Sequence, residues 1–178
     1  LCKLAYDEAG KDFEKAVVLI NERGWNEPIG DEVEEIGEGI IESYVHGKEQ
    51  RLVALVEVKC KTDFVARNED FKKFAHELAL QIAAMKPEYI SKESVSEEEL
   101  VKLKDIFQKE AESEGKPENI REKIVEGKLN KFFSEKCLLE QKWFKDESKT
   151  ISNLLDEATQ KLGEPLEIRR MLLWEFGK

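Results

Sequence analysis

The chain has 178 residues, of which 40% are hydrophobic and 38% are charged, which suits one substantial hydrophobic core with a small additional module. Lysine and arginine number 29 against 39 aspartates and glutamates, so the formal net charge is -10. This excess of acidic residues argues against a basic surface that binds the phosphate backbone of nucleic acids, and we therefore expect no nucleic-acid partner.

The cysteines and the apolar runs exclude further classes of protein. Cys2, Cys60 and Cys137 are far apart and show no CxxC or Cys/His spacing, which argues against a disulfide framework and against a zinc site. No apolar run approaches the length of a membrane span, and no signal peptide is recognised. We expect a cytoplasmic protein without a metal, a cofactor or a membrane association.

The N-terminal segment predicts a small helical module. Residues 1–24 have the pattern of two short helices, one ended by Gly10 and the next capped by Asp12. So short a piece cannot hold a core alone, and Leu1 already falls inside a helical pattern. We therefore expect a truncated module whose first helix precedes the chain. The acid- and glycine-rich stretch at 25–37 predicts a linker.

Two β-rich segments predict a hairpin. GIIESYVHG at 39–47 and QRLVALVEVKC at 50–60 alternate as strands do, and HGKEQ forms the turn between them. After a short polar stretch, residues 71–82 repeat apolar side chains at the spacing of an amphipathic helix that would cover the sheet, and Pro87 ends it. One face of the second strand carries Ala54, Val56, Val58 and Cys60.

The next region predicts two highly charged helices, from Ser94 to about Glu112 and from Pro117 to about Ser134. EGKP joins them, so they would form a thin antiparallel helical hairpin. So much charge around a narrow apolar stripe indicates a projecting arm at about 94–134 instead of a core element. The stripe would bring Leu100, Leu103 and Phe107 against Ile120, Ile124 and Phe132.

The C-terminal region predicts a helix and a third strand. SKTISNLLDEATQKLG at 148–163 carries an apolar helical face and ends in glycine, and PLEIRRMLLWEFG at 165–177 alternates as a strand does. We therefore expect an α+β fold in which residues 38–178 form a three-stranded antiparallel sheet covered by helices, with the arm projecting from it.

The candidate catalytic groups are few and poorly placed. His46 falls in the hairpin turn, His76 lies on the polar side of a helix, and Cys60 falls on the apolar face of a strand, where an inert thiol is expected. No P-loop, GxGxxG, HExxH or GxSxG pattern occurs. We expect that the chain is not an enzyme.

The turn TDFVARN, at 62–68, is the segment that simple packing explains least. Thr62 can cap a short helix, Asp63 suits the first turn of that helix, and Phe64 could tuck beneath the following helix as a hydrophobic staple. However, the following helix already has a full apolar face, and Phe64 lies outside its period. Pattern alone leaves the phenylalanine unexplained.

The stretch VEVKCKTDFVARNEDF, at 56–71, resembles the signature of the elongation factor Ts family. Further segments resemble that family in its own order, so the resemblance covers nearly the whole chain. The spacing is similar to the short bacterial form with one sheet-bearing core module. The segments are LCKLAYDEAGKDFEKAVVLI, EGIIESYVHG, ALQIAAMKPEYIS, EGKPENIREKIVEGKLNKFF, LLEQKWFKDESKTISNLL and IRRMLLWEFG.

The resemblance implies a guanine-nucleotide exchange factor for elongation factor Tu that associates as a homodimer, with the core at 38–178 as its dimerisation domain. It also implies that the N-terminal helices are the end of a ubiquitin-associated-like domain. In the family the acid and the aromatic of the TDF motif intrude beside the Mg²⁺ site of the partner, and here these residues are Asp63 and Phe64. A lysine, Lys61, precedes the motif where the family usually has an acid or an amide. Further partner contacts implied by position are Lys3, His46, Thr62, Val65, Arg67 and Asn68. The last four are either contacts or the scaffold of Asp63, and Arg67 and Asn68 could equally support the turn by ion pairing and capping.

A second hypothesis belongs to a different class. A non-catalytic interaction scaffold, or a chaperone-like protein with a helical arm, would also be acidic, α+β and without catalytic motifs. Asp63 and Phe64 discriminate between the two, because a simple scaffold has no need of an acid and an aromatic in a polar turn.

Overall fold

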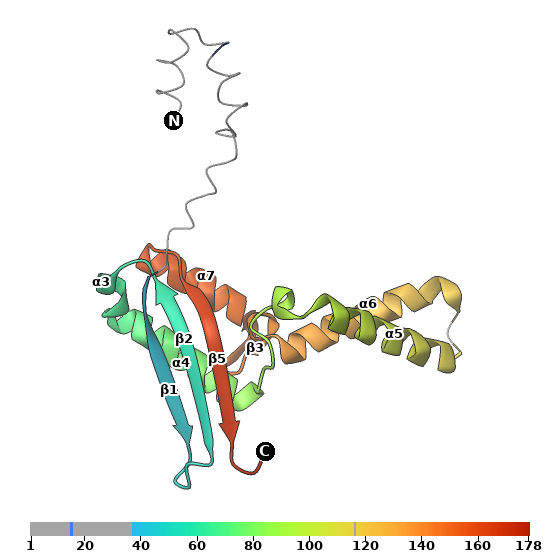
Figure 1. The fold of residues 1–178 in the computed structure, drawn as a ribbon, viewed down its shortest axis with the longest axis horizontal. Helices are drawn as coiled ribbons and strands as arrows, with labels where there is room; N and C mark the ends of the chain where they lie inside the picture. The colour runs from blue at the N-terminus through green and yellow to red at the C-terminus, as the bar shows by residue number, and fades with distance from the viewer. Residues whose placement is uncertain (1–14, 16–36, 116) are drawn as a thin grey trace. The chain divides into compact units, whose positions relative to one another are not determined.

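The computed structural model describes residues 15, 37–115 and 117–178. The helical module predicted at 1–24, most of the linker predicted at 25–37 and the predicted contact Lys3 lie outside them, so these expectations stay predictions. In the described part from residue 37 onward, the α+β class is confirmed. A three-stranded antiparallel sheet is covered by helices, and a helical hairpin projects from this core (Figure 1).

The three long strands are those that the alternation predicts. They are β1 (Glu38–His46), β2 (Leu52–Cys60) and β5 (Glu167–Glu175), in the order β1-β2-β5 with both pairs antiparallel. Glu38 pairs with Cys60 and His46 pairs with Leu52. At about 3.3 Å per residue, the turn after Cys60 and the β1–β2 hairpin therefore lie at opposite ends of the sheet, roughly 26 Å apart.

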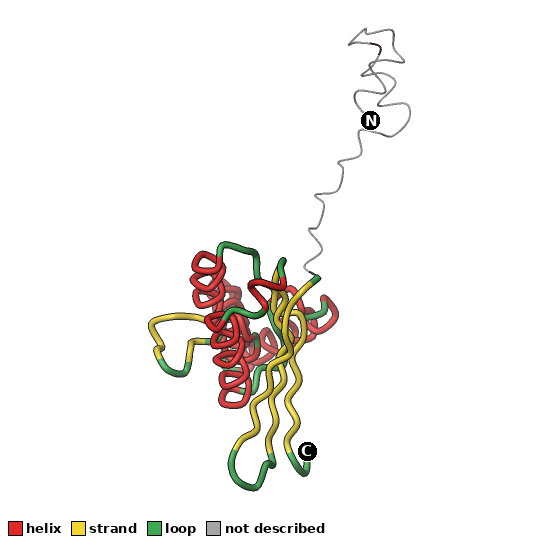
Figure 2. Tube along the Cα trace, turned by 90° about the vertical axis from the view of Figure 1, so that its left-hand side faces the viewer, coloured by secondary structure: helices red, strands yellow, loops and turns green. Residues whose placement is uncertain are grey.

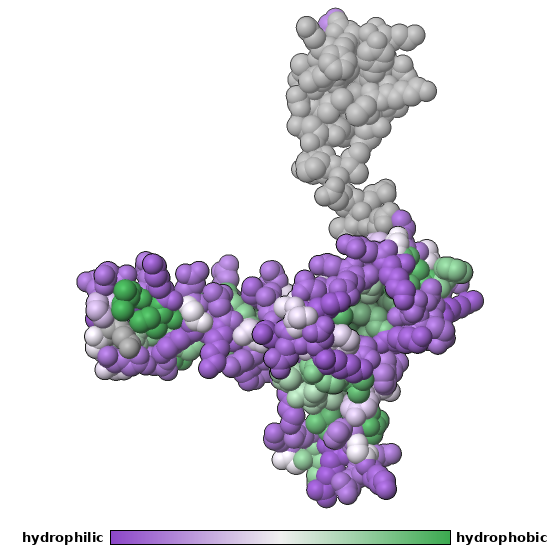
Figure 3. Space-filling view, turned by 180° about the vertical axis from the view of Figure 1, so that it is seen from behind, coloured by the Kyte–Doolittle hydropathy of each residue, from purple (hydrophilic) through white to green (hydrophobic). Residues whose placement is uncertain are grey.

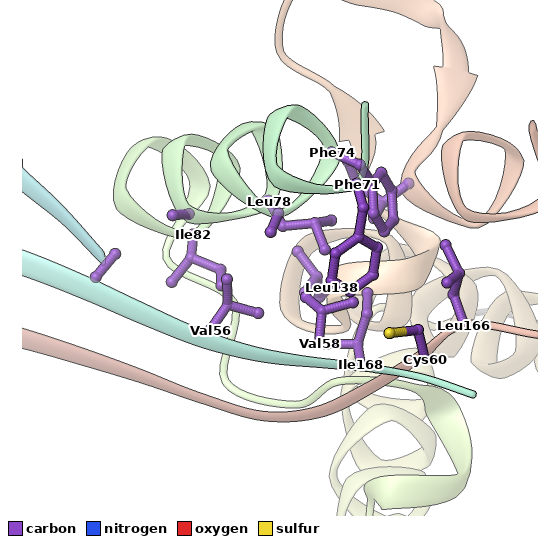
Figure 4. Close-up of a cluster of buried hydrophobic side chains, with 14 of the residues drawn as sticks. Val56, Val58, Cys60, Phe71, Phe74, Leu78, Ile82, Leu138, Leu166 and Ile168 are labelled. Carbon is purple, nitrogen blue, oxygen red and sulfur yellow. The ribbon is translucent and has the colours of Figure 1, made fainter. Parts of the chain in front are cut away.

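One face of the sheet is buried beneath α4 (Glu69–Met85), and α7 (Ile151–Leu162) completes the core. Figure 4 shows Phe71, Leu78 and Ile82 of α4 pointing at Val56 and Val58 of β2, and all five side chains are almost fully buried. Seen edge-on in Figure 2, the sheet has the core helices on one side. The pattern of alternate residues in β2 and of every third or fourth residue in α4 explains this packing.

The arm consists of α5 (Glu97–Ser113) and α6 (Glu118–Lys136), close to the predicted bounds. The cap of α5 is Ser96, whose hydroxyl accepts a hydrogen bond from the Glu99 N–H at 3.3 Å, and Ser94 instead ends a short 3-10 turn, η1 (Lys92–Ser94). Of the predicted stripe, Ile120 proves exposed, whereas Ala111 and Leu129 are the residues buried between the helices. Figure 3 shows a hydrophilic arm with a hydrophobic patch near its tip.

The sequence pattern did not predict the structure of the connection between the arm and α7. A 3-10 turn, η2 (Leu138–Glu140), leads into a small hairpin of β3 (Lys142–Trp143) and β4 (Asp146–Thr150). The predicted helix at 148–163 therefore begins only at Ile151, with Thr150 as its cap. The hairpin is held by a buried pair, because Gln81 Nε2 donates to Gln141 Oε1 at 3.1 Å and Gln81 Oε1 accepts from the Phe144 N–H at 3.0 Å.

Candidate functional site

The turn after β2 folds as a single-turn helix, α3 (Asp63–Ala66), with one buried and one exposed side. Val65 and Ala66 pack into the core, with only 3% of Val65 exposed, while Asp63 and Phe64 face away from it. Since α3 spans so few residues, this packing and its caps must hold it in place, because a helix this short is not stable alone.

Phe64 is 77% exposed. It therefore does not tuck beneath α4, and the hydrophobic-staple interpretation of the sequence is wrong for this residue. Leaving a phenylalanine in water forgoes roughly 1.5–3 kcal/mol that its burial would gain. The turn thus presents an aromatic side chain, beside an exposed carboxylate, on a firmly packed base.

The charges of the turn lie at its surface. Arg67 Nη2 and Asp63 Oδ2 form an ion pair at 3.1 Å, with the two side chains 82% and 62% exposed. A pair so open to water contributes at most about 1 kcal/mol to stability. Its main effect is to hold the Asp63 carboxylate on the same side of α3 as the Arg67 guanidinium. Lys61, also exposed, adds a second positive charge next to the motif.

Two caps fix the ends of the turn. Thr62 Oγ1 accepts from the Val65 N–H at 3.3 Å at the start of α3, and Asn68 Oδ1 accepts from the Asp70 N–H at 2.8 Å at the start of α4. The capping expected for both residues is confirmed. Val65 was expected either to contact the partner or to support Asp63; it is buried and packs as part of the scaffold of the turn, and its contact with a partner stays a prediction.

Glu164 is the residue of this site that the sequence did not reveal. Its Oε2 accepts from the Thr62 N–H at 3.1 Å, and its Oε1 accepts from the Thr62 hydroxyl at 2.6 Å. The two residues are 102 positions apart in the chain. A contact of this kind leaves no periodic or local signal, so only the fold could show it.

His46 lies far from the turn, at the other end of β1. Its ring nitrogen Nδ1 is 3.0 Å from the Tyr44 hydroxyl, and the imidazole is exposed. Asp63 and His46 therefore form two separate regions, and a single partner touching both would have to extend along the length of the sheet.

The groups considered for catalysis are not assembled into a site. Burial, and then the charge of the Glu164 carboxylate, raise the pKa of the Cys60 thiol, so the reactive thiolate is disfavoured. His76 is exposed and its Nδ1 lies 2.9 Å from Glu42 Oε1, a partner other than Cys60. No cluster of metal-ligating side chains occurs among the described residues. In that same part of the chain, every helix is too short or too polar to cross a membrane.

Comparison with known proteins gives consistent matches. The family model described as "Elongation factor TS" matches residues 29–178. A curated elongation factor Ts from Coprothermobacter proteolyticus is 48% identical over 177 residues, which cover 99% of this chain and 89% of that protein. The corresponding proteins of Desulforamulus reducens and Thermosipho melanesiensis are 45% and 42% identical over 99% of this chain, covering 81% and 90% of their own lengths.

Proposed function

The chain belongs to the elongation factor Ts family, the guanine-nucleotide exchange factors of elongation factor Tu, and from this membership we propose that its turn at 62–68 drives the release of GDP. An exchange factor makes and breaks no covalent bond, so the chain is not an enzyme in that sense. As a factor of translation elongation it would work in the cytoplasm. The observation that carries the proposal is the exposed Phe64 beside Asp63 on a packed base.

The proposed step is the insertion of Phe64 into elongation factor Tu. Bound GDP is held by Mg²⁺ and by backbone N–H groups around its phosphates. Displacing the elements that hold the metal therefore lowers the affinity of elongation factor Tu for GDP. Burying the Phe64 ring in the partner would supply roughly 1.5–3 kcal/mol, equivalent to a factor of about 10 to 100 in affinity. This energy is available because the ring is unburied in the free protein.

Asp63 would act on the same region through its charge. In the free protein its carboxylate is paired with Arg67 at the surface. Because that pair is weak in water, the carboxylate can exchange Arg67 for a donor or a cation of the partner at little cost. A carboxylate placed near the Mg²⁺ site would compete for the environment of the metal.

Release of the factor follows from thermodynamic linkage. The factor by which this chain weakens nucleotide binding to elongation factor Tu must equal the factor by which nucleotide weakens binding of the chain. Incoming GTP would therefore expel the chain and complete one exchange cycle. His46 at the far end of β1 would provide a second contact that keeps the partner attached while the turn acts.

The uncovered face of the sheet supports a proposed homodimer. Opposite α4, this face carries several exposed apolar side chains, and the strand register brings Trp174 next to Val53 and Leu172 next to Leu55. A monomer rarely leaves several large apolar side chains together on one exposed face. A second copy packed face to face would cover it in both protomers. The exposed apolar residues of this face are Ile41, Val45, Leu172 and Trp174.

Trp174→Glu is expected to convert this dimer into monomers. Trp174 is 63% exposed in the single chain, so a charge there is tolerated in the monomer but would be buried unpaired in the dimer. Light scattering across a concentration series measures the mass. The control is Val101→Glu on the exposed side of α5, which should leave the mass unchanged. A monomer mass for the unmodified chain at every concentration would contradict the proposed homodimer.

The test of the proposed function is the release of a fluorescent GDP from elongation factor Tu in the presence of Mg²⁺. The chain is expected to accelerate release, and the acceleration should depend on the turn at 62–68. Failure to accelerate release at micromolar concentrations of the chain would overturn the proposal.

A further inference from the structure

The carboxylate of Glu164 accepts two hydrogen bonds from Thr62, the first residue of the turn at 62–68. Both oxygens are used, because Oε2 accepts from the Thr62 N–H at 3.1 Å and Oε1 accepts from the Thr62 hydroxyl at 2.6 Å. Hydrogen bonds to an ionised acceptor are about twice as strong as neutral ones, and a pair of them also fixes direction. Thr62 therefore has a defined position relative to the connection between α7 and β5.

Glu164 is itself held on both sides. Gly163 ends α7 in the left-handed conformation, with φ of 74°, and its N–H donates to the Thr159 carbonyl at 2.9 Å. Pro165 follows and restricts Glu164 to extended backbone, and Leu166 is then buried in the core. The carboxylate is thus mounted on a part of the chain with little conformational freedom.

The location of this carboxylate is unfavourable for helix stability. It lies just beyond the C-terminus of α7, where the helix macrodipole opposes a negative charge. Within the described residues, Glu164 accepts two hydrogen bonds, both from Thr62. These two bonds to the turn at 62–68 are therefore the favourable interaction that offsets the unfavourable location of the carboxylate.

The hydroxyl of Thr62 connects Glu164 to α3. It donates its proton to Glu164 and accepts from the Val65 N–H at 3.3 Å, so its orientation is determined by both partners. The carbonyl of Thr62 accepts from the Ala66 N–H at 3.1 Å, which closes the single turn of α3. The direction in which Phe64 projects depends on that turn.

We propose that Glu164 is a positioning residue for nucleotide exchange, which orients the Asp63–Phe64 pair through its two hydrogen bonds to Thr62. This inference rests on the proposed function of the turn and adds a residue from the distant α7–β5 connection to it. Glu164 acts through Thr62 and touches neither nucleotide nor metal.

Glu164→Ala is expected to lower the maximal rate of GDP release from elongation factor Tu about tenfold, since hydrogen bonds to a charged group are lost from the cap of α3. The concentration of chain that gives half-maximal acceleration should stay close to that of the unmodified chain, because the other contacts are intact. Glu164→Gln keeps one acceptor oxygen and should fall between the two, which provides a folded variant if the alanine variant is unstable. Glu167→Ala, at the first residue of β5 and opposite Lys59 instead of Thr62, is the matched control.

Two further variants separate positioning from general loss of structure. Thr62→Ser keeps the hydroxyl and should exchange nearly as the unmodified chain, whereas Thr62→Val should resemble Glu164→Ala. In a Phe64→Ala background, Glu164→Ala should cause no further loss, because the group that it orients is gone.

Three outcomes would contradict the inference. If both Glu164 variants exchange normally while Phe64→Ala is impaired, the positioning role of Glu164 is overturned and the proposed function of the turn stands. Multiplicative losses in the double variant would show that Glu164 acts independently of Phe64. If Phe64→Ala itself exchanged normally, the proposed function of the turn would fail and the role of Glu164 with it.

Discussion

Phe64→Ala is expected to lower the rate of GDP release from elongation factor Tu by a factor of about 10 to 100, the equivalent of burying one phenylalanine in the partner. The same substitution should change the free energy of unfolding by no more than about 0.5 kcal/mol, as is usual for an exposed position. The reason is that the ring is 77% exposed and supports nothing in the core. Exchange kinetics and urea unfolding measure the two effects separately.

A matched control is Phe144→Ala. Phe144 is a half-exposed phenylalanine on the β3–β4 hairpin, outside the turn and outside the uncovered sheet face. The same truncation there should leave exchange unchanged. A loss of stability of about 2 kcal/mol or more for Phe64→Ala would instead show that the ring is packed, as the hydrophobic-staple interpretation required.

Phe71→Ala is expected to destabilise the fold by about 3–5 kcal/mol, the usual range for removing a buried phenylalanine and leaving a cavity. Phe71 is 0% exposed and lies in the first turns of α4, between that helix and β2. Because folded domains have only about 5–15 kcal/mol of stability, this variant could lose a large part of it. Urea unfolding followed by circular dichroism provides the measurement.

Lys72→Ala, one residue further along α4, is the control for the Phe71 substitution. Lys72 is exposed and its ammonium group forms a surface ion pair with Glu69 at 2.9 Å, so its loss should have little effect on the free energy of unfolding. A Phe71→Ala variant within about 1 kcal/mol of the unmodified chain would mean that the core described around α4 is incorrect.

The elements with strong periodicity could be predicted from the sequence. Alternation identified β1, β2 and β5, and the three-and-four spacing identified α4 and α7, because in each of them one side is buried in a continuous core. The β3–β4 hairpin was missed because DESKT, in β4, is polar and only partly covered, so it carries no alternation of apolar residues. Gln81 of α4 holds it by donating to the Lys142 carbonyl and accepting from the Phe144 N–H, and such contacts across the chain leave no local signal.

The candidate site could be predicted only in part. The caps at Thr62 and Asn68 follow from residue type and position, and both are present. The exposure of Phe64 could not be decided, because a staple and a projecting ring have the same sequence pattern. The burial of Val65 and the grip of Glu164 depend on how α3 meets the core and on a hydrogen-bonded pair 102 residues apart. These features are properties of tertiary structure.

The helical arm provides the strongest case for the competing hypothesis of a non-catalytic holder. Val101, Ile106 and Ile120 are exposed apolar residues on α5 and α6, and such side chains can bind a partner without any effect on nucleotide. Binding to elongation factor Tu is therefore not enough to establish the action of the turn. The two hypotheses differ only in whether bound nucleotide leaves faster.

The most direct measurement is the rate at which fluorescent GDP leaves Mg²⁺-loaded elongation factor Tu in excess unlabelled GDP, with the chain at concentrations below and above that of its partner. Binding is measured in the same samples. The exchange account predicts that the rate rises with the concentration of the chain and saturates, and that less than one chain per partner suffices for complete release. Detectable binding with an unchanged rate of GDP release would contradict it.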